Sequence, residues 1–158
     1  MLRLLWISAL VLVLDQATKA WIQAAFQPGE SLEILPFFNL VLAYNTGAAF
    51  SFLSDGGGWQ RWLFIGLALV VAVVLLVWLR RLEEDDRMAG WGVALVLGGA
   101  IGNVIDRIWL GHVVDFLDFY WAGWHWPAFN VADSAITCGV MLLLLDGFLP
   151  TRKAGATP

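Results

Sequence analysis

The chain has 158 residues, of which 60% are hydrophobic and 14% are charged, with ten Trp and a mean hydropathy of +0.76. Soluble domains carry about 25% charged residues, so this chain has too few polar side chains to coat a soluble fold. The net charge of −4 argues against a nucleic-acid-binding protein, and the single cysteine, Cys138, excludes an internal disulfide. Lipid is therefore the expected solvent.

Four stretches are apolar enough to cross a bilayer as helices, each near the required length of about 20 residues. They cover about 4–25, 62–79, 88–107 and 131–149. No repeat or linker divides the chain, so we expect one integral membrane domain over residues 1–158. The predicted fold class is an all-α polytopic membrane protein with four transmembrane helices.

The distribution of Lys and Arg predicts the orientation. If the four helices alternate in direction, one side of the membrane receives Arg3, Arg80, Arg81, Arg87, Arg152 and Lys153. The positive-inside rule makes that side the cytoplasm. The two opposite segments, about 26–60 and 108–128, contain neither Lys nor Arg. Both termini are therefore expected in the cytoplasm.

The two outer segments carry different signals. Residues 31–44 alternate loosely between apolar and polar side chains, which predicts short strands on the outer membrane surface, broken at Pro36. Between Phe116 and Phe129 the chain is rich in Trp, Tyr and Phe, the composition of an aromatic belt at headgroup depth. We expect a small outer sheet and an aromatic-rich outer loop.

The first span contains Asp15 and Lys19, which lie four residues apart on one helix face and can pair. Because buried charges are normally paired, their main expected role is structural. The same span also fits a cleaved signal peptide, since Arg3 precedes an apolar run and small residues follow it. Cleavage would remove a charged pair that the bilayer otherwise has no reason to hold.

The third span combines small and polar residues. Gly98 and Gly102 form a small-residue face suited to close helix contact. A neighbouring stripe, at steps of four residues, holds Gly99, Asn103 and Arg107. Asp106 lies beside them at the outer end of the span, where these polar groups can satisfy one another or a bound backbone.

Two further acids lie near the outer boundary of the membrane. Asp115 follows the third span and Asp133 opens the fourth, and the connection between them is long enough to bring the two carboxylates together. Two carboxylates in a desolvated site share a proton, which makes them a general acid and base without a metal. In the alternative interpretation, Asp115 caps a turn and Asp133 is an ordinary acid in the first turn of a helix.

Other catalytic groups are poorly placed. His112 and His125 are isolated in the sequence, so a serine triad or a metal centre would have to combine residues from distant parts of the chain. Packing at the membrane interface is the expected role of both histidines. Cys138 has apolar neighbours and is expected to be a small buried hydrophobic residue.

Five motifs in order resemble the lipoprotein signal peptidase family, also called signal peptidase II. The motifs are Asp15-Gln16-Ala17-Thr18-Lys19, Asn45-Thr46-Gly47-Ala48-Ala49-Phe50-Ser51, the run from Gly98 to Arg107, Val113-Val114-Asp115-Phe116 and Phe129-Asn130-Val131-Ala132-Asp133-Ser134. The resemblance implies an aspartyl endopeptidase with Asp115 and Asp133 as the catalytic pair. It implies substrate-binding or supporting roles for Asn45, Gly99, Asn103, Arg107, Asn130 and Ala132. Structural roles follow for Asp15, Lys19 and Asp106, and neither a cofactor nor a metal is implied.

The resemblance also implies partners and a location. Members cut prolipoproteins before a cysteine that carries a diacylglyceryl group, and cyclic peptides of the globomycin type inhibit them. We expect a monomer in the bacterial inner membrane, in contact with membrane lipid and with its active site near the periplasmic face. The alternative function is a small proton-coupled carrier subunit that uses Asp15, Asp106 and Asp133 as a relay. A purely structural membrane subunit would leave the outer polar cluster unexplained.

Overall fold

The computed structural model describes residues 1–47 and 57–148, and in these residues four helices are long and apolar enough to cross a membrane. The helices are α1 (Leu5–Ala25), α2 (Trp59–Arg81), α3 (Arg87–Trp109) and α4 (Val131–Phe148), with a short 3-10 turn, Leu2–Leu4, before α1. Four strands complete the fold: β1 (Ser31–Leu35), β2 (Phe38–Asn45), β3 (Val113–Trp121) and β4 (Trp124–His125). The prediction of a multi-pass membrane protein with a small sheet is confirmed.

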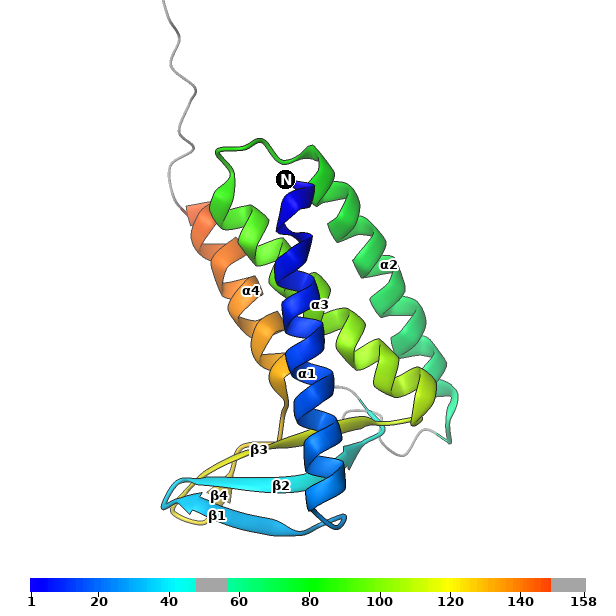
Figure 1. Ribbon diagram of the computed structural model, residues 1–158, viewed down its shortest axis with the longest axis vertical. Helices are drawn as coiled ribbons and strands as arrows, with labels where there is room; N and C mark the ends of the chain where they lie inside the picture. The colour runs from blue at the N-terminus through cyan, green and yellow to red at the C-terminus, as the bar shows by residue number, and fades with distance from the viewer. Residues whose placement is uncertain (48–56, 149–158) are drawn as a thin grey trace, which may run out of the picture.

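Helix α3 forms the centre of the bundle, and the sheet lies at the end away from the N-terminus (Figure 1). Of the apolar stretch of α3, 72% is buried inside the protein, against 33% for α1 and 17% for both α2 and α4. The outer helices instead expose large aliphatic side chains such as Leu67, Val70 and Leu144, which is the expected surface for contact with lipid. The burial of α3 explains why polar groups collect on it.

Glycines let the helices approach α3 closely. A Cβ at Gly98 would lie 2.8 Å from the backbone oxygen of Ser8 in α1, and a Cβ at Gly102 would lie 2.6 Å from the carboxylate of Asp15. Gly99 faces the other way, against the backbone carbonyl of Ala132 in α4. The predicted small-residue face of Gly98 and Gly102 therefore packs on α1, and Gly99, on the neighbouring stripe, packs on α4.

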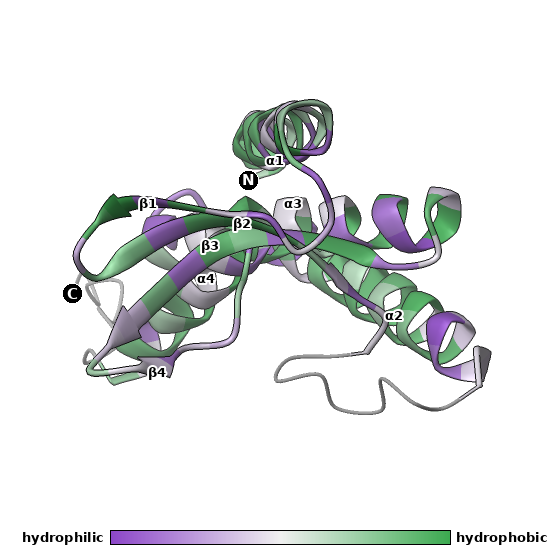
Figure 2. Cartoon of the chain, turned by 90° about the horizontal axis from the view of Figure 1, so that it is seen from below, coloured by the Kyte–Doolittle hydropathy of each residue, from purple (hydrophilic) through white to green (hydrophobic). Residues whose placement is uncertain are grey.

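The sheet is antiparallel, with strand order β1-β2-β3-β4. Figure 2, seen from the sheet end, shows β1, β2 and β3 side by side with α1 across one face. Pro36 lies in the turn between β1 and β2, as predicted. Four buried side chains join α1 to this sheet: Ile22, Leu42, Val114 and Phe116. The sheet is thereby fixed to the bundle.

The aromatic segment between Phe116 and Phe129 was predicted as a loop, and this prediction is wrong for most of its length. Residues 113–121 form β3, which pairs with β2 on one side and with β4 on the other. The first four residues of β3 are buried on both faces of the sheet, so the chain shows no alternation of apolar and polar residues there. A strand of this kind gives no period-two signal.

The sheet end of the bundle carries one cation that the sequence interpretation left out. Helix α2 begins at Trp59, whereas the predicted span began at residue 62, so Arg61 lies in the first turn of α2. Arg61 Nη2 donates to the carbonyl of Ile108 at 2.7 Å and so joins the start of α2 to the end of α3. At the other end of the bundle, Arg3 pairs with Glu84 in the connection between α2 and α3.

Candidate active site

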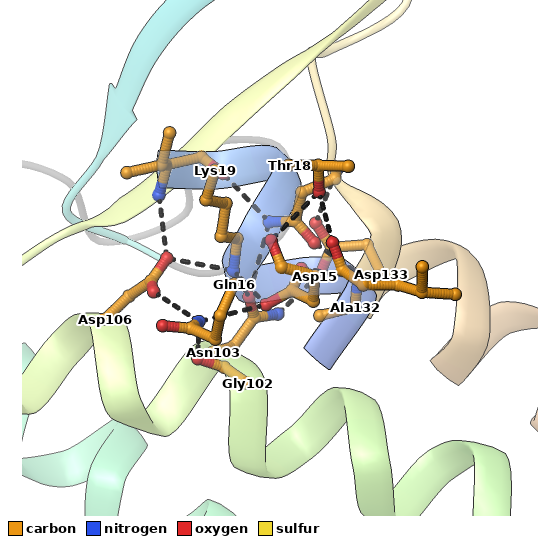
Figure 3. A network of polar contacts seen from close by, with 12 residues as sticks. Asp15, Gln16, Thr18, Lys19, Gly102, Asn103, Asp106, Ala132 and Asp133 are labelled. Atoms are coloured by element: carbon orange, nitrogen blue, oxygen red, sulfur yellow. Dashed lines mark hydrogen bonds and ion pairs between the residues drawn. The ribbon is translucent and has the colours of Figure 1, made fainter. Parts of the chain in front are cut away.

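A buried lysine lies between two buried acids at the interface of α1 and α3 (Figure 3). Lys19 Nζ is 2.8 Å from Asp15 Oδ2 and 2.9 Å from Asp106 Oδ2. The three side chains are at most 3% exposed. The predicted pairing of Asp15 with Lys19 is confirmed, and Asp106 is a second partner that the helical spacing alone did not reveal.

The two acids also accept hydrogen bonds from other groups of the fold. Asp15 Oδ1 accepts from the backbone N–H of Ala132 in α4 at 2.9 Å. Asp106 Oδ1 accepts from Gln16 Nε2 at 2.9 Å, and Asp106 Oδ2 accepts from the N–H of Val114 in β3 at 3.1 Å. A buried carboxylate needs such donors because no water is there to solvate it. The charge cluster consequently holds α1, α3, α4 and β3 together.

Asn103 connects this cluster to Asp133. Its Oδ1 accepts from Lys19 Nζ at 3.0 Å, and its Nδ2 donates to Asp133 Oδ1 at 2.8 Å. Asp133 thus receives a hydrogen bond from an amide whose other end is bound to a buried ammonium. Gly99, four residues before Asn103, brings α4 close enough to α3 for this contact.

Asn130 caps α4 and also reaches the second acid. Its Oδ1 accepts from the N–H of Asp133 at 2.9 Å, while Asp133 Oδ2 accepts from the N–H of Asn130 at 3.3 Å, which is a reciprocal capping arrangement. Asn130 Nδ2 donates to Asp115 Oδ1 at 2.8 Å. Asn45 Nδ2 donates to Asp115 Oδ2 at 3.1 Å. Asp115 lies in strand β3, opposite Ala43, so the alternative interpretation that it caps a turn is wrong.

Asp115 and Asp133 line the same pocket of about 590 Å³. Burial, followed by the charge of Asp133, raises the pKa of Asp115 to about 7, against the smaller opposing effects of Asn45, Asn130 and Lys19. A carboxyl group with this pKa can both donate and accept a proton near neutral pH. The pocket is thus equipped for acid–base chemistry.

The comparison with known families agrees with this geometry. A family model described as signal peptidase (SPase) II matches residues 7–149. The chain belongs to the signal peptidase II family. A lipoprotein signal peptidase of Aeromonas hydrophila is 53% identical over 158 residues, with 99% of this chain and 95% of that relative covered. One from Pseudomonas putida is 58% identical over 146 residues, with 91% and 85% covered.

A solved structure supports the same assignment. It is described as a bacterial membrane enzyme solved by the in meso method at 2.3 Å, and it superposes with a TM-score of 0.84 at 31% identity. The match covers 100% of this chain and 96% of that one. As a member of the signal peptidase II family the chain is a peptidase, and the carrier alternative finds no support.

In this member of the signal peptidase II family, Arg107 holds the segment that follows β2. Its Nη2 donates to the carbonyl of Gly47 at 2.9 Å, its Nη1 donates to the carbonyl of Asn103 at 3.3 Å, and its guanidinium lies over the ring of Phe64. Gly47 N–H in turn donates to Asn45 Oδ1 at 2.9 Å. The rest of the motif that begins at Asn45, residues 48–51, lies outside the described residues.

A second polar cluster of this peptidase was missed in the sequence. Asp118, which is buried, accepts from Asn39 Nδ2 at 2.8 Å and lies 2.9 Å from His125 Nδ1. His125 also stacks on Tyr120. His125 was expected only to pack at the interface, and it instead ties β4 to β3. Asn39 and Asp118 are cross-strand partners, so a correct strand assignment would have brought them together.

Two further expectations can be compared with the structure of the pocket and its rim. Cys138 is exposed and lines the pocket, so the prediction of a buried cysteine is wrong. Val140 and Met141, which follow it on α4, are also exposed, as expected for a surface in contact with lipid. His112 packs against the ring of Tyr44 with the two ring planes tilted, and burial lowers the pKa of His112. Among the described residues, no group of three or more His, Cys, Asp and Glu side chains is arranged to hold a metal ion.

Proposed function

We propose that this peptidase cleaves diacylglyceryl-modified prolipoproteins directly before the lipidated cysteine, with Asp115 and Asp133 as its aspartic catalytic pair. The observation that carries the proposal is the position of the two carboxylates. They come from separate elements, β3 and α4, and line one pocket at the sheet end of the bundle. Amide groups of Asn45, Asn103 and Asn130 donate to them and orient them.

The proposed reaction uses one proton shared by the pair. The charged carboxylate removes a proton from a water molecule as its oxygen bonds to the scissile carbonyl carbon, and the protonated carboxyl gives its proton to the carbonyl oxygen. The tetrahedral intermediate then collapses: the newly protonated carboxyl gives its proton to the amide nitrogen as the C–N bond breaks, and one hydroxyl of the intermediate returns its proton to the other carboxylate as the carbonyl re-forms. The pair again holds one proton at the end of the cycle. The raised pKa of Asp115, about 7, suits a group that must change its protonation state within each cycle.

The shape of the pocket suits a substrate that is held by lipid. One wall carries polar groups of β2 and α3, including Asn45 and Arg107, and the other wall runs along α4 past Ile136 and Cys138. Since α4 exposes apolar side chains, this wall continues into the surface that contacts lipid. Acyl chains anchored in the membrane would hold the scissile bond at the depth of the carboxylates.

The same proposal places the enzyme in the bacterial inner membrane as a monomer. Three of the Arg residues that predict the cytoplasmic side, Arg80, Arg81 and Arg87, lie at the end of the bundle away from the pocket (Figure 1). This supports cytoplasmic termini and a pocket near the periplasmic face. Cyclic peptide inhibitors of the globomycin type would occupy the pocket between the two carboxylates and α4.

The experiment is cleavage of a lipidated precursor peptide by purified Asp115→Asn and Asp133→Asn variants. Each change keeps the shape of the side chain and removes a proton-transfer group, so we expect a loss of roughly 10²-fold to 10⁴-fold in rate. The matched control is Asp118→Asn, a buried acid of the same strand that does not line the pocket. Cleavage close to the wild-type rate in either variant of the pair would refute the assignment.

A further inference from the structure

Lys19 makes a contact that its structural role does not require. A buried ammonium flanked by two carboxylates, Asp15 and Asp106, already has its charge compensated. Its third hydrogen bond goes to the neutral amide of Asn103, which is 8% exposed and which binds Asp133 with its other end. The ammonium is therefore one amide away from the proposed catalytic pair.

The chemistry of the ammonium fixes the direction of that amide. An ammonium has three donors and no acceptor, so Asn103 must turn its oxygen toward Lys19. Its NH₂ then points at Asp133 Oδ1. The oxygen of Asn103 also accepts from Asn130 Nδ2 at 3.3 Å. This NH₂ group of Asn130 also donates to Asp115 Oδ1. The two amides thus present donors, and no acceptor, to the two carboxylates.

We propose that Lys19 is a positioning residue of the catalytic pair, which acts by holding Asn103 with its NH₂ toward Asp133. This inference rests on the proposed function of Asp115 and Asp133. With the amide fixed, a shared proton cannot point at Asn103, because no acceptor is offered there. The proton is left to the carboxylate oxygens that face the pocket. A reversed Asn103 would accept that proton and hold it away from the substrate.

The charge of Lys19 acts in the same direction. In the part of the chain that the structure describes, the charged groups that act on the pair are Asp15 and Lys19 on α1 and Arg107 on α3, while Asp106 acts on Lys19 and Arg107. The positive charge of Lys19 opposes the effects of burial and of Asp133 on Asp115. Its removal should therefore raise the pKa of Asp115 further and move the pH dependence of cleavage to higher pH.

The test compares Lys19→Gln with wild type, since a glutamine is neutral and can offer Asn103 either a donor or an acceptor. A second variant, Asp15→Asn with Lys19→Gln, removes one charge of each sign, so the buried cluster keeps its wild-type net charge and only Asp106 loses its ionic partner. Lys19→Arg keeps a positively charged group that only donates hydrogen bonds, so it tests whether the conservative change retains activity and the pH profile. The matched control is Ser8→Ala, which deletes the 2.7 Å hydrogen bond from Ser8 to the carbonyl of Ala94 in the same pair of helices without touching Asn103.

We expect kcat to fall by on the order of a hundredfold with KM little changed, because the reacting groups are misoriented while the pocket stays intact. The pH optimum should rise by on the order of half a unit, and Lys19→Arg should recover part of both losses. Ser8→Ala should lower the unfolding temperature and keep the wild-type pH profile. For a variant that cleaves too slowly for a pH profile, the pKa shift of Asp115 can be measured by infrared titration of its carboxyl C=O band. The band is identified by its disappearance in Asp115→Asn.

Wild-type kcat and pH profile in the folded Lys19→Gln variants would overturn the inference and leave Lys19 a purely structural residue. Asp115→Asn and Asp133→Asn are assayed beside them. If these two variants stay active, the proposed function fails. If they are inactive while Lys19→Gln behaves as wild type, only the role of Lys19 fails.

Discussion

Replacement of Gly139 by alanine should separate α4 from α3 and slow cleavage. Gly139 lies where the two helices touch: a Cβ there would be 2.7 Å from the carbonyl oxygen of Gly92 and 2.7 Å from Val96 Cγ2. Both distances are at least about 0.7 Å shorter than ordinary contact between non-bonded atoms. One of the two neighbours is backbone, so a side-chain rotation cannot relieve the crowding.

The magnitude follows from two opposing effects. Overpacking of this kind costs about 1–3 kcal/mol, whereas the change from glycine to alanine in a helix gains about 1 kcal/mol. Gly147 on the same helix has no neighbour within 4 Å of an added Cβ, so Gly147→Ala reports the gain alone. The two unfolding temperatures should differ by roughly 2–12 °C, from about 2–4 °C for each kcal/mol.

The assay is thermal unfolding in detergent together with cleavage of a lipidated precursor. A displaced α4 carries Asp133 with it, so Gly139→Ala should be on the order of tenfold slower, while Gly147→Ala should cleave at the wild-type rate. Equal stability and equal rates in the two variants would show that α4 does not depend on the contact at Gly139 for its position.

Three other outcomes are expected. A precursor without the diacylglyceryl group should be cleaved on the order of a hundredfold more slowly than the lipidated one in the same micelles, and equal turnover would indicate a general membrane peptidase. Chelators should leave cleavage unchanged, since the proposed reaction uses no metal; strong inhibition by EDTA would contradict it. The pH dependence of stability should also change in Asp115→Asn. The folded state holds the pKa of Asp115 at about 7, above its ordinary value, so it binds more protons than the unfolded chain between those two values. Wild-type stability should therefore fall as pH rises through that window, and the variant should lack this part of the slope; identical unfolding curves across the window would refute the raised pKa.

The helices were predictable because the bilayer imposes a long apolar run on each of them. Their ends were less so: α2 starts at Trp59 and contains Arg61 in its first turn, because a helix can continue into the headgroup region where Trp and Arg are tolerated. Strand β3 was missed because its first residues are buried on both faces. Because β3 was not predicted, the contacts of Asp118 with Asn39 and His125 could not be predicted from the sequence either.

For the site, the sequence placed Asp115 and Asp133 near the same boundary, and the structure brings both to one pocket. The path from Lys19 through Asn103 to Asp133 was not predictable, because it joins three helices and the sequence does not state which faces meet. Asp106 illustrates the same limit: its spacing suggested local partners on α3, and it binds Lys19 on α1 instead.

The contact between Asp15 and Ala132 has a consequence for biosynthesis. The two residues are 117 positions apart, so α1 enters the membrane long before its partner in α4 has been synthesised. During that interval Asp15 and Lys19 have each other, since their spacing lets them pair within one helix. The pairing makes α1 acceptable to the bilayer on its own, and the arrival of α4 then supplies both the missing donor for Asp15 and the second wall of the pocket. A chain that stops before α4 would therefore be inserted with Asp15 paired only with Lys19, lacking the Ala132 donor, and would have no Asp133.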